Sequence, residues 1–408
     1  MSVVDPYLML PLQLLIYALY RVIRTIIFIE SDLYTLVRKL LQHEKTGNVE
    51  FFNILTRFRL DPTDIAQDHD FLIFNDGFGI IEDLIEPCWM IYTITERYVY
   101  FVRIPYECPL SISTTTRLTA LCYNSADKLA RMDIGDFLTE TKSRIDPSRG
   151  RVVILHSSPC CGGSMLGRLL SSVDVTESRL LVLGEPPVLT ALAVLAQHLS
   201  IETMRSITAA SLRFSMRDIE KDQVVVMKAR SCCAKIVPYI HVTMPSIQHL
   251  FITARDPTVA IPRLLSSTSQ NLPALHMACN LLSYSPAICD FFTCWRLLES
   301  EMIQKIGPKA DFEFALAQIM GCIISYQRNL KYYALEVTYA EDLLNDPLTV
   351  IRPILDVCGM SNMAVTDHRA WKLREETAIQ SQCIAPLDDV QRQRVKLLVE
   401  YLQQDWCR

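Results

Sequence analysis

A glycine-bearing turn has residue types that suit the binding of an anion. It follows the apolar run Val152–Leu155 and precedes a helical pattern over Met165–Ser171. Its sequence is His156-Ser157-Ser158-Pro159-Cys160-Cys161-Gly162-Gly163-Ser164. Free backbone N–H groups and the helix dipole meet at the start of such a helix and attract phosphate. The turn therefore predicts a phosphate cradle, with an ordinary strand-to-helix turn capped by Ser164 as the alternative.

The turn departs from the loop of ATP- and GTP-hydrolysing proteins. That loop reads Gly-x-x-x-x-Gly-Lys-Ser/Thr. Here the first glycine is absent, and no lysine precedes Ser164. A diverged kinase or nucleoside triphosphatase is accordingly the third of the functions that we consider.

Three further segments carry charged residues at the end of an apolar run. Phe251–Ala260 includes Arg255-Asp256-Pro257, and Tyr339–Pro347 includes Glu341 and Asp342. The third segment is Val224–Lys228, which ends in a lysine. In parallel sheets ligands bind beyond the carboxyl ends of the strands, so these positions are where a site is expected.

In chain order the four segments resemble those of the sulfotransferase family. Pro159, Gly162 and Ser164 match the loop that holds the 5′-phosphosulfate of 3′-phosphoadenosine-5′-phosphosulfate (PAPS). Arg255-Asp256-Pro257 is similar to the family's 3′-phosphate motif, and Tyr339–Pro347 resembles a segment near the end of these domains. The resemblance covers roughly residues 151–400.

The resemblance implies PAPS as the co-substrate and sulfuryl transfer to a hydroxyl or amine acceptor by in-line displacement, with no metal. It implies that these residues bind the co-substrate: Cys160, Cys161, Gly162, Gly163 and Ser164 at the 5′ end, and Arg255 and Arg263 at the 3′-phosphate. The candidate catalytic residues are Glu185 and His156 as bases, and Lys228 as a cation. Their alternatives are a helix-capping carboxylate, a structural histidine and a solvated surface lysine.

Four positions differ from the family pattern and put catalysis in doubt. Cys160 stands where the family has a loop lysine or arginine, and Gly163 replaces a second hydroxyl. Arg263 stands at a serine position, and Arg230 at the histidine position of the cytosolic branch. A thiol donates no charged hydrogen bond to the transferred group, whose charge such enzymes must stabilise. A sulfotransferase-fold binding or scaffold protein without activity is therefore the second function.

The elements around these segments predict an α/β fold. Continuous apolar runs alternate with helical patterns, which is typical of a parallel sheet covered on both faces. The predicted strands are Val152–Leu155 in the centre, Leu180–Leu183, Val224–Met227, Leu250–Thr253 and Ala334–Thr338. The predicted helices between them are Val188–Leu199, Ile201–Ser215, Ala287–Ile306 and Phe312–Leu330. We expect a three-layer α/β/α domain of the P-loop or sulfotransferase type over residues 149–408.

Residues 31–148 predict an α+β region of unknown role. Asp32 is expected to begin a helix with Leu33, Val37, Leu40 and Leu41 on its apolar face. A strand over Phe71–Phe74 is expected to end at the turn Asn75-Asp76-Gly77. Trp89–Thr95 and Arg97–Ile104 predict paired strands, and Thr114–Thr119 a further strand.

Composition and the N-terminus limit the compartment and the partners. A net charge of −5 over 408 residues gives no basic excess for nucleic acid, and 14 scattered cysteines favour free thiols in a reducing compartment. Residues 1–30 are largely apolar, but the uncharged stretch of 15 residues from Pro6 to Tyr20 is short for a spanning helix. A helix docked on the body of a cytoplasmic protein is the first expectation. Association of residues 7–29 with a membrane, including that of the Golgi, is the alternative. The acceptor and the oligomeric state are left open.

Overall fold

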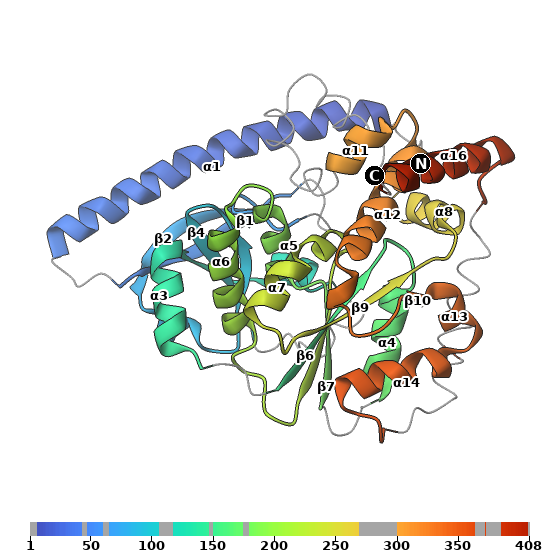
Figure 1. The fold of residues 1–408 in the computed structure, drawn as a ribbon. Coiled ribbons are helices and arrows are strands. Elements are labelled where there is room, and N and C mark those ends of the chain that lie inside the picture. The colour runs from blue at the N-terminus through green and yellow to red at the C-terminus, as the bar shows by residue number, and fades with distance from the viewer. Residues whose placement is uncertain are drawn as a thin grey trace. The chain divides into compact units, whose positions relative to one another are not determined.

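A computed structural model describes residues 6–42, 47–59, 65–105, 117–146, 150–173, 179–268, 300–363, 372 and 385–406 (Figure 1). The chain divides into two compact units. Unit 1 comprises Met1–Gly150, Glu185–Lys221 and Val242–Met244. Unit 2 comprises Arg151–Gly184, Asp222–His241 and Pro245–Arg408.

Unit 2 contains a parallel five-stranded sheet, as predicted. Its strands are β6 (Arg151–Ser157), β7 (Leu180–Gly184), β8 (Val224–Lys228), β9 (Gln248–Thr253) and β10 (Thr338–Tyr339). The order is β10-β9-β6-β8-β7, so β6 lies in the centre and pairs with β8 and β9. The strand expected over Ala334–Thr338 is wrong in its bounds, because only two residues pair with β9 there.

Alternate residues of these strands face two helical layers. Val153 and Leu155 of β6 pack with α4 (Gly163–Val173) and α14 (Pro347–Cys358). On the other face, Phe251 of β9 packs with Cys322 of α12 (Asp311–Arg328) and with η3 (Ser231–Ile236). The three-layer α/β/α architecture follows, because every strand is apolar on both faces.

The remaining helices of unit 2 lie along the same chain order. They are α8 (Pro257–Thr268), α11 (Ser300–Ile306), η5 (Leu330–Tyr332), α13 (Ala340–Asn345) and α16 (Asp389–Trp406). The short α7 (Val237–Thr243) crosses from unit 2 into unit 1. α8, α12 and α16 share one apolar cluster. The helix expected over Ala287–Ile306 is present from Ser300, and its first part lies outside the described residues.

Unit 1 contains an antiparallel five-stranded sheet in the order β2-β1-β5-β4-β3. Its strands are β1 (Val49–Arg57), β2 (Phe71–Gly79), β3 (Trp89–Ile94), β4 (Tyr98–Arg103) and β5 (Lys128–Asp133). The predicted pairing of β3 with β4 is confirmed.

Two predictions in unit 1 are wrong. The turn at Asn75-Asp76-Gly77 is a bulge inside β2, where the pairing with β1 shifts register and Gly77 has a φ of 150°. Thr119 belongs to α2 (Leu118–Ser125) and not to a strand; residues 114–116 lie outside the described residues. Leu118 and Cys122 of α2 are both buried, and their i, i+4 spacing is helical.

The helices of unit 1 cover the antiparallel sheet. They are η1 (Ile81–Leu84), α3 (Ile134–Arg144), α5 (Pro187–Leu195) and α6 (Ile201–Ser215). α5 packs on β3, and α6 packs on α3. Phe137 of α3 and Phe214 of α6 meet Phe101 of β4, with ring centroids 5.8 and 5.0 Å from it. The two helices that connect β7 to β8 along the chain therefore belong to the core of the other sheet.

α1 (Pro6–Gln42) is one continuous helix of 37 residues (Figure 1). Tyr20 Oη donates to the His69 carbonyl at 3.0 Å, and Arg24 Nη2 donates to the Asp68 carbonyl at 2.8 Å. Asp32 begins no helix: it lies within α1 and its carboxylate is 3.4 Å from Arg131. Among the described helices, none combines the length and the apolar character needed to cross a bilayer.

Candidate functional site

The predicted loop joins β6 to α4 and is tied to the neighbouring strand β9. The Ser158 amide donates to the Ile252 carbonyl at 3.1 Å. Thr253 Oγ1 donates to Ser158 Oγ at 2.8 Å in a buried position. Because the base of the loop is bonded to β9, the start of α4 is placed at the carboxyl edge of the sheet.

Gly163 explains one departure from the family pattern. A Cβ at this residue would lie 2.5 Å from Ser157 Oγ, which is closer than real contacts allow. A serine or threonine could occupy this position only if Ser157 moved. The preceding Gly162 has a φ of 86°, in the left-handed region that favours glycine. The two glycines thus let the backbone approach both Ser157 and a ligand closely.

The loop presents two side chains to solvent and withdraws a third. Cys160 and Ser164 are exposed, whereas Cys161 is buried and its Sγ donates to the Pro159 carbonyl at 3.2 Å. Burial raises the pKa of the Cys161 thiol to about 12. Cys161 therefore stays a neutral thiol, and only its backbone is available to an anion.

Lys228 lies beside this loop. It ends β8, where it pairs in register with Leu155 of β6 and Gly184 of β7. Its Cε lies 3.5 Å from the position that a Cβ of Gly163 would take. The structure thus brings a lysine side chain to the start of α4, where the free amides of the first helical turn point.

Arg255 follows β9 and joins two of the segments that the sequence singled out. Its Nη2 donates to both carboxylate oxygens of Asp342, at 2.7 and 2.8 Å, and its amide donates to Glu341. The guanidinium lies 4.0 Å from the centroid of the Tyr339 ring. Hydrogen bonding to Asp342 raises the pKa of Arg255. All these groups are at the surface, so the pair is weak and an incoming anion can compete with Asp342.

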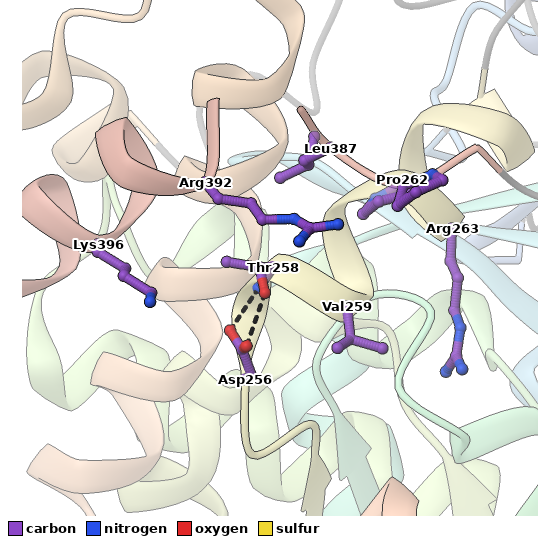
Figure 2. Close-up of a pocket in the computed structure, with 9 residues that line it drawn as sticks. Asp256, Thr258, Val259, Pro262, Arg263, Leu387, Arg392 and Lys396 are labelled. Carbon is purple, nitrogen blue, oxygen red and sulfur yellow. Dashed lines mark hydrogen bonds between the residues drawn. The ribbon is translucent and has the colours of Figure 1, made fainter. Parts of the chain in front are cut away.

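Arg263 lines an open pocket of about 440 Å³ between α8 and α16. Figure 2 shows Arg392 and Lys396 reaching from α16 toward the first turn of α8, where Asp256 accepts from the Thr258 amide at 2.8 Å. Three cationic side chains against one carboxylate make the lining basic, in a chain that is acidic overall.

Sequence reasoning missed Arg392 and Lys396. The signal that could have found them is their i, i+4 spacing, which places both on one face of a helix. Spacing does not say which neighbour that face meets, because the pocket forms only when α16 packs on α8 and α12.

His156 is fully buried within the sheet. Its Nε2 lies 3.1 Å from Nδ1 of His249 on β9, and both rings contact Tyr333. Burial and then His249 lower the pKa of His156 well below its usual value, and burial lowers that of His249 to about 3. Both rings are neutral at pH 7, and His156 is out of reach of an acceptor in solvent.

Glu185 directly follows β7 and belongs to unit 1. Its φ is 53°, a left-handed conformation that is uncommon for a residue with a side chain. Its carboxylate lies 3.5 Å from Arg117 Nε, and its carbonyl accepts from Thr119 Oγ1 at 2.9 Å. The cap of α5 is Pro186, so Glu185 stands one residue before the cap.

A search for metal sites within the described ranges returns no cluster of three or more His, Cys, Asp or Glu side chains. Polar chemistry at the edge of the parallel sheet therefore rests on the hydroxyl, thiol, lysine and arginine groups described above.

Comparisons with known proteins give distant structural similarities. No protein-family model and no curated protein matches the chain. The sulfotransferase domain from the curacin biosynthetic pathway is similar at 13% identity and a TM-score of 0.33, over 62% of this chain and 99% of that domain. Sulfotransferase STF9 from Mycobacterium avium is similar at 14% identity and a TM-score of 0.33, over 65% of this chain and 79% of that protein. At these TM-scores the similarities carry no argument, and the α/β assignment rests on the strand order of the sheet.

Proposed function

We propose that this chain is a divergent sulfotransferase that moves a sulfuryl group from PAPS to a hydroxyl or amine acceptor. The observation that carries the proposal is Lys228, whose side chain lies against Gly163 at the loop. The family's loop cation is absent at Cys160, and Lys228 supplies a positive charge at the same loop. The four sequence segments that resemble the family add support.

The loop and Lys228 divide the work at the 5′ end of the nucleotide. The amides of Gly163 and Ser164 and the Ser164 hydroxyl hold the phosphosulfate, since the first amides of a helix have no partner within it. Lys228 neutralises the charge that develops on the leaving phosphate oxygen. Cys160 lines the loop without contributing charge.

The reaction exchanges one bond to sulfur for another. The acceptor oxygen or nitrogen attacks sulfur, the bond from sulfur to the phosphate oxygen breaks, and 3′,5′-adenosine bisphosphate leaves. The acceptor proton passes to a base, and Glu185 is the carboxylate that we assign to this role. His156 has no part in it, because it is buried and neutral.

The 3′-phosphate needs cations, and unit 2 offers them on α8 and α16. Arg263, Arg392 and Lys396 line one pocket, and Arg255 stands at the end of β9. Arg255 would exchange its exposed pairing with Asp342 for the phosphate. A phosphate with nearly two charges offsets the loss of that pair, since charged hydrogen bonds contribute about 1.5–3 kcal/mol.

Turnover of radiolabelled PAPS with a panel of hydroxyl and amine acceptors tests the proposal. We expect transfer by the wild-type chain and at least a tenfold loss of kcat in Lys228→Met, as for removal of one charge-stabilising group. The control is Lys309→Met, an exposed lysine at the start of α12. Equal activity of both variants would remove Lys228 from the site.

A second function is favoured by Cys160 alone. If no cation reaches the sulfuryl group, the fold binds the nucleotide without transferring it. Thermal stabilisation by 3′,5′-adenosine bisphosphate, without stabilisation by ATP and without turnover of PAPS, would identify this nucleotide-binding protein. Stabilisation by ATP alone would point to the third function, a diverged kinase or triphosphatase.

A further inference from the structure

An apolar stripe runs along the side of α1 that does not pack on the sheet. We define the α1 stripe as Leu12, Leu15, Leu19, Val22, Ile26, Ile29, Leu33, Leu36 and Leu40. Each of these residues is between 49% and 69% exposed. Isolated exposed aliphatic residues are ordinary, but a contiguous set of this size marks an interaction surface.

The spacing of the α1 stripe identifies the kind of surface that it fits. Successive members are alternately three and four residues apart over the whole stripe. This heptad repeat keeps a seam of side chains facing another helix. An ideal helix drifts by about 20° per heptad against such a repeat, so a flat surface gives no reason to keep it over four heptads. The stripe therefore fits a second helix.

The opposite side of α1 is already occupied. Tyr17, Tyr20, Ser31 and Thr35 are buried, and the Asn75 amide of β2 donates to Ser31 Oγ at 2.9 Å. Because unit 1 uses this side, the stripe faces away from the sheet that holds the helix.

The charges of α1 disfavour a lipid surface as the occupant. Helices that lie in a membrane interface carry Lys or Arg on their polar side. Arg21 donates to Tyr17 Oη at 3.3 Å, and Arg24 donates to the carbonyls of Phe71 and Asp68. The exposed charged residues beside the stripe are acidic, Glu30 and Asp32, and an anionic membrane repels them.

We propose that the α1 stripe binds the α1 stripe of a second copy of this chain, forming a symmetric dimer. The stripe contains no polar residue, so pairing with itself buries no unpaired charge, and Ile16, Ile23 and Val37 widen it. Twelve half-exposed aliphatic side chains offer roughly 1,000 Å² of apolar surface, against about 800 Å² per partner in a standard interface. Closed two-fold pairing is also the commonest symmetry of soluble oligomers.

Sedimentation equilibrium of the full chain, with a matched pair of variants, tests the dimer. Ile29→Glu places a charge in the stripe, and Ile201→Glu places one on α6; the two isoleucines are 62% and 59% exposed. We expect the wild-type chain and Ile201→Glu to be dimers. Ile29→Glu should dissociate at least about a hundredfold more readily, because each copy would bury a carboxylate. Circular dichroism should be the same for both variants, since both positions are exposed.

Two results would overturn the proposal. One is a monomeric wild-type chain at every concentration studied. The other is dissociation of the dimer to the same degree by both variants. A parallel flotation assay with phosphatidylcholine vesicles, with and without phosphatidylserine, identifies a different occupant. A monomer that floats with either kind of vesicle, and loses this in Ile29→Glu, would assign the stripe to a membrane.

Discussion

The two units handle their charges in opposite ways. In unit 1, Arg59 and Asp70 form an ion pair inside the core, where both side chains are less than 5% exposed and both bond to Tyr92. In unit 2, Arg255 and Asp342 form a pair whose side chains are about half exposed. A buried pair depends on both partners, whereas an exposed pair contributes little and can be replaced by a ligand.

The basic pocket of unit 2 sharpens this contrast. The Arg131 guanidinium of unit 1 is bonded to Glu50 and lies over the rings of Phe28 and Tyr98, at 4.9 and 4.7 Å from their centroids. Arg392 and Lys396 instead lie exposed along a pocket. Cations that are fully used hold a fold together, and cations that face an open pocket are available to an anion.

The largest effect is expected when the buried pair of unit 1 is broken. Asp70→Ala leaves Arg59 charged inside the core, so the free energy of unfolding should fall by about 3–5 kcal/mol. Asp342→Ala breaks the exposed pair of unit 2 and should cost less than about 1 kcal/mol. Urea unfolding of both variants measures the difference. Similar losses would mean that burial does not separate the two pairs.

A smaller effect is expected on ligand binding at the pocket of unit 2. Arg263→Ala should weaken the binding of 3′,5′-adenosine bisphosphate by about 2 kcal/mol, the scale of a lost charged hydrogen bond. The binding of 5′-AMP should hardly change, because it lacks the 3′-phosphate. Isothermal titration of both nucleotides makes the comparison. Equal losses for the two would show that Arg263 shapes the pocket without contacting the phosphate.

The buried histidines of unit 2 predict a dependence of stability on pH. In the folded chain the pKa values of His156 and His249 lie below the unfolded value of about 6.5. The unfolded chain therefore binds more protons as pH falls below about 6.5, and stability is complete only above that pH.

Each histidine contributes at most about 1.4 kcal/mol per pH unit to this loss. For His249 the loss continues down to its folded pKa of about 3. Urea unfolding from neutral to acidic pH measures the slope, and His249→Asn should make it shallower whatever its effect on stability at pH 8. An unchanged slope would show that the pair does not titrate on unfolding.

The smallest effect concerns the two neighbouring loop thiols. Iodoacetamide should modify Cys160, which is exposed, and spare Cys161, whose buried thiol has a pKa of about 12. The fold should be unaffected, since Cys160 is at the surface. Peptide mass spectrometry locates the label, and 3′,5′-adenosine bisphosphate should protect Cys160 if the loop binds it. Modification of both thiols under native conditions would contradict the burial of Cys161.

The parallel sheet was predictable because its strands are apolar on both faces. Val152–Leu155 and Val224–Met227 are uninterrupted runs, and both are strands close to the predicted bounds. The antiparallel sheet was predicted only in part. β1 carries Asn53, Thr56 and Arg57 among its apolar residues, because much of it faces solvent, and its sequence lacked the signal of a core strand.

Local sequence also determined which segments are helical, but it did not determine their partners. The helix over Ile201–Ser215 was predicted with its bounds, yet it packs on the antiparallel sheet that precedes it in the chain. Asp32 has the residue type of a helix cap, but α1 continues through it, because the apolar and docking faces on both sides of Asp32 keep one helical period.

The sequence by itself determined the type of fold and the positions of the glycine turn and of Arg255, since these depend on short-range patterns. Only the tertiary structure decided which side chains meet. It placed Lys228 against Gly163, buried His156 on His249, and closed Arg263, Arg392 and Lys396 around one pocket. The physical reason is that such contacts join residues far apart in the chain, and their geometry is set by how the layers of the fold pack.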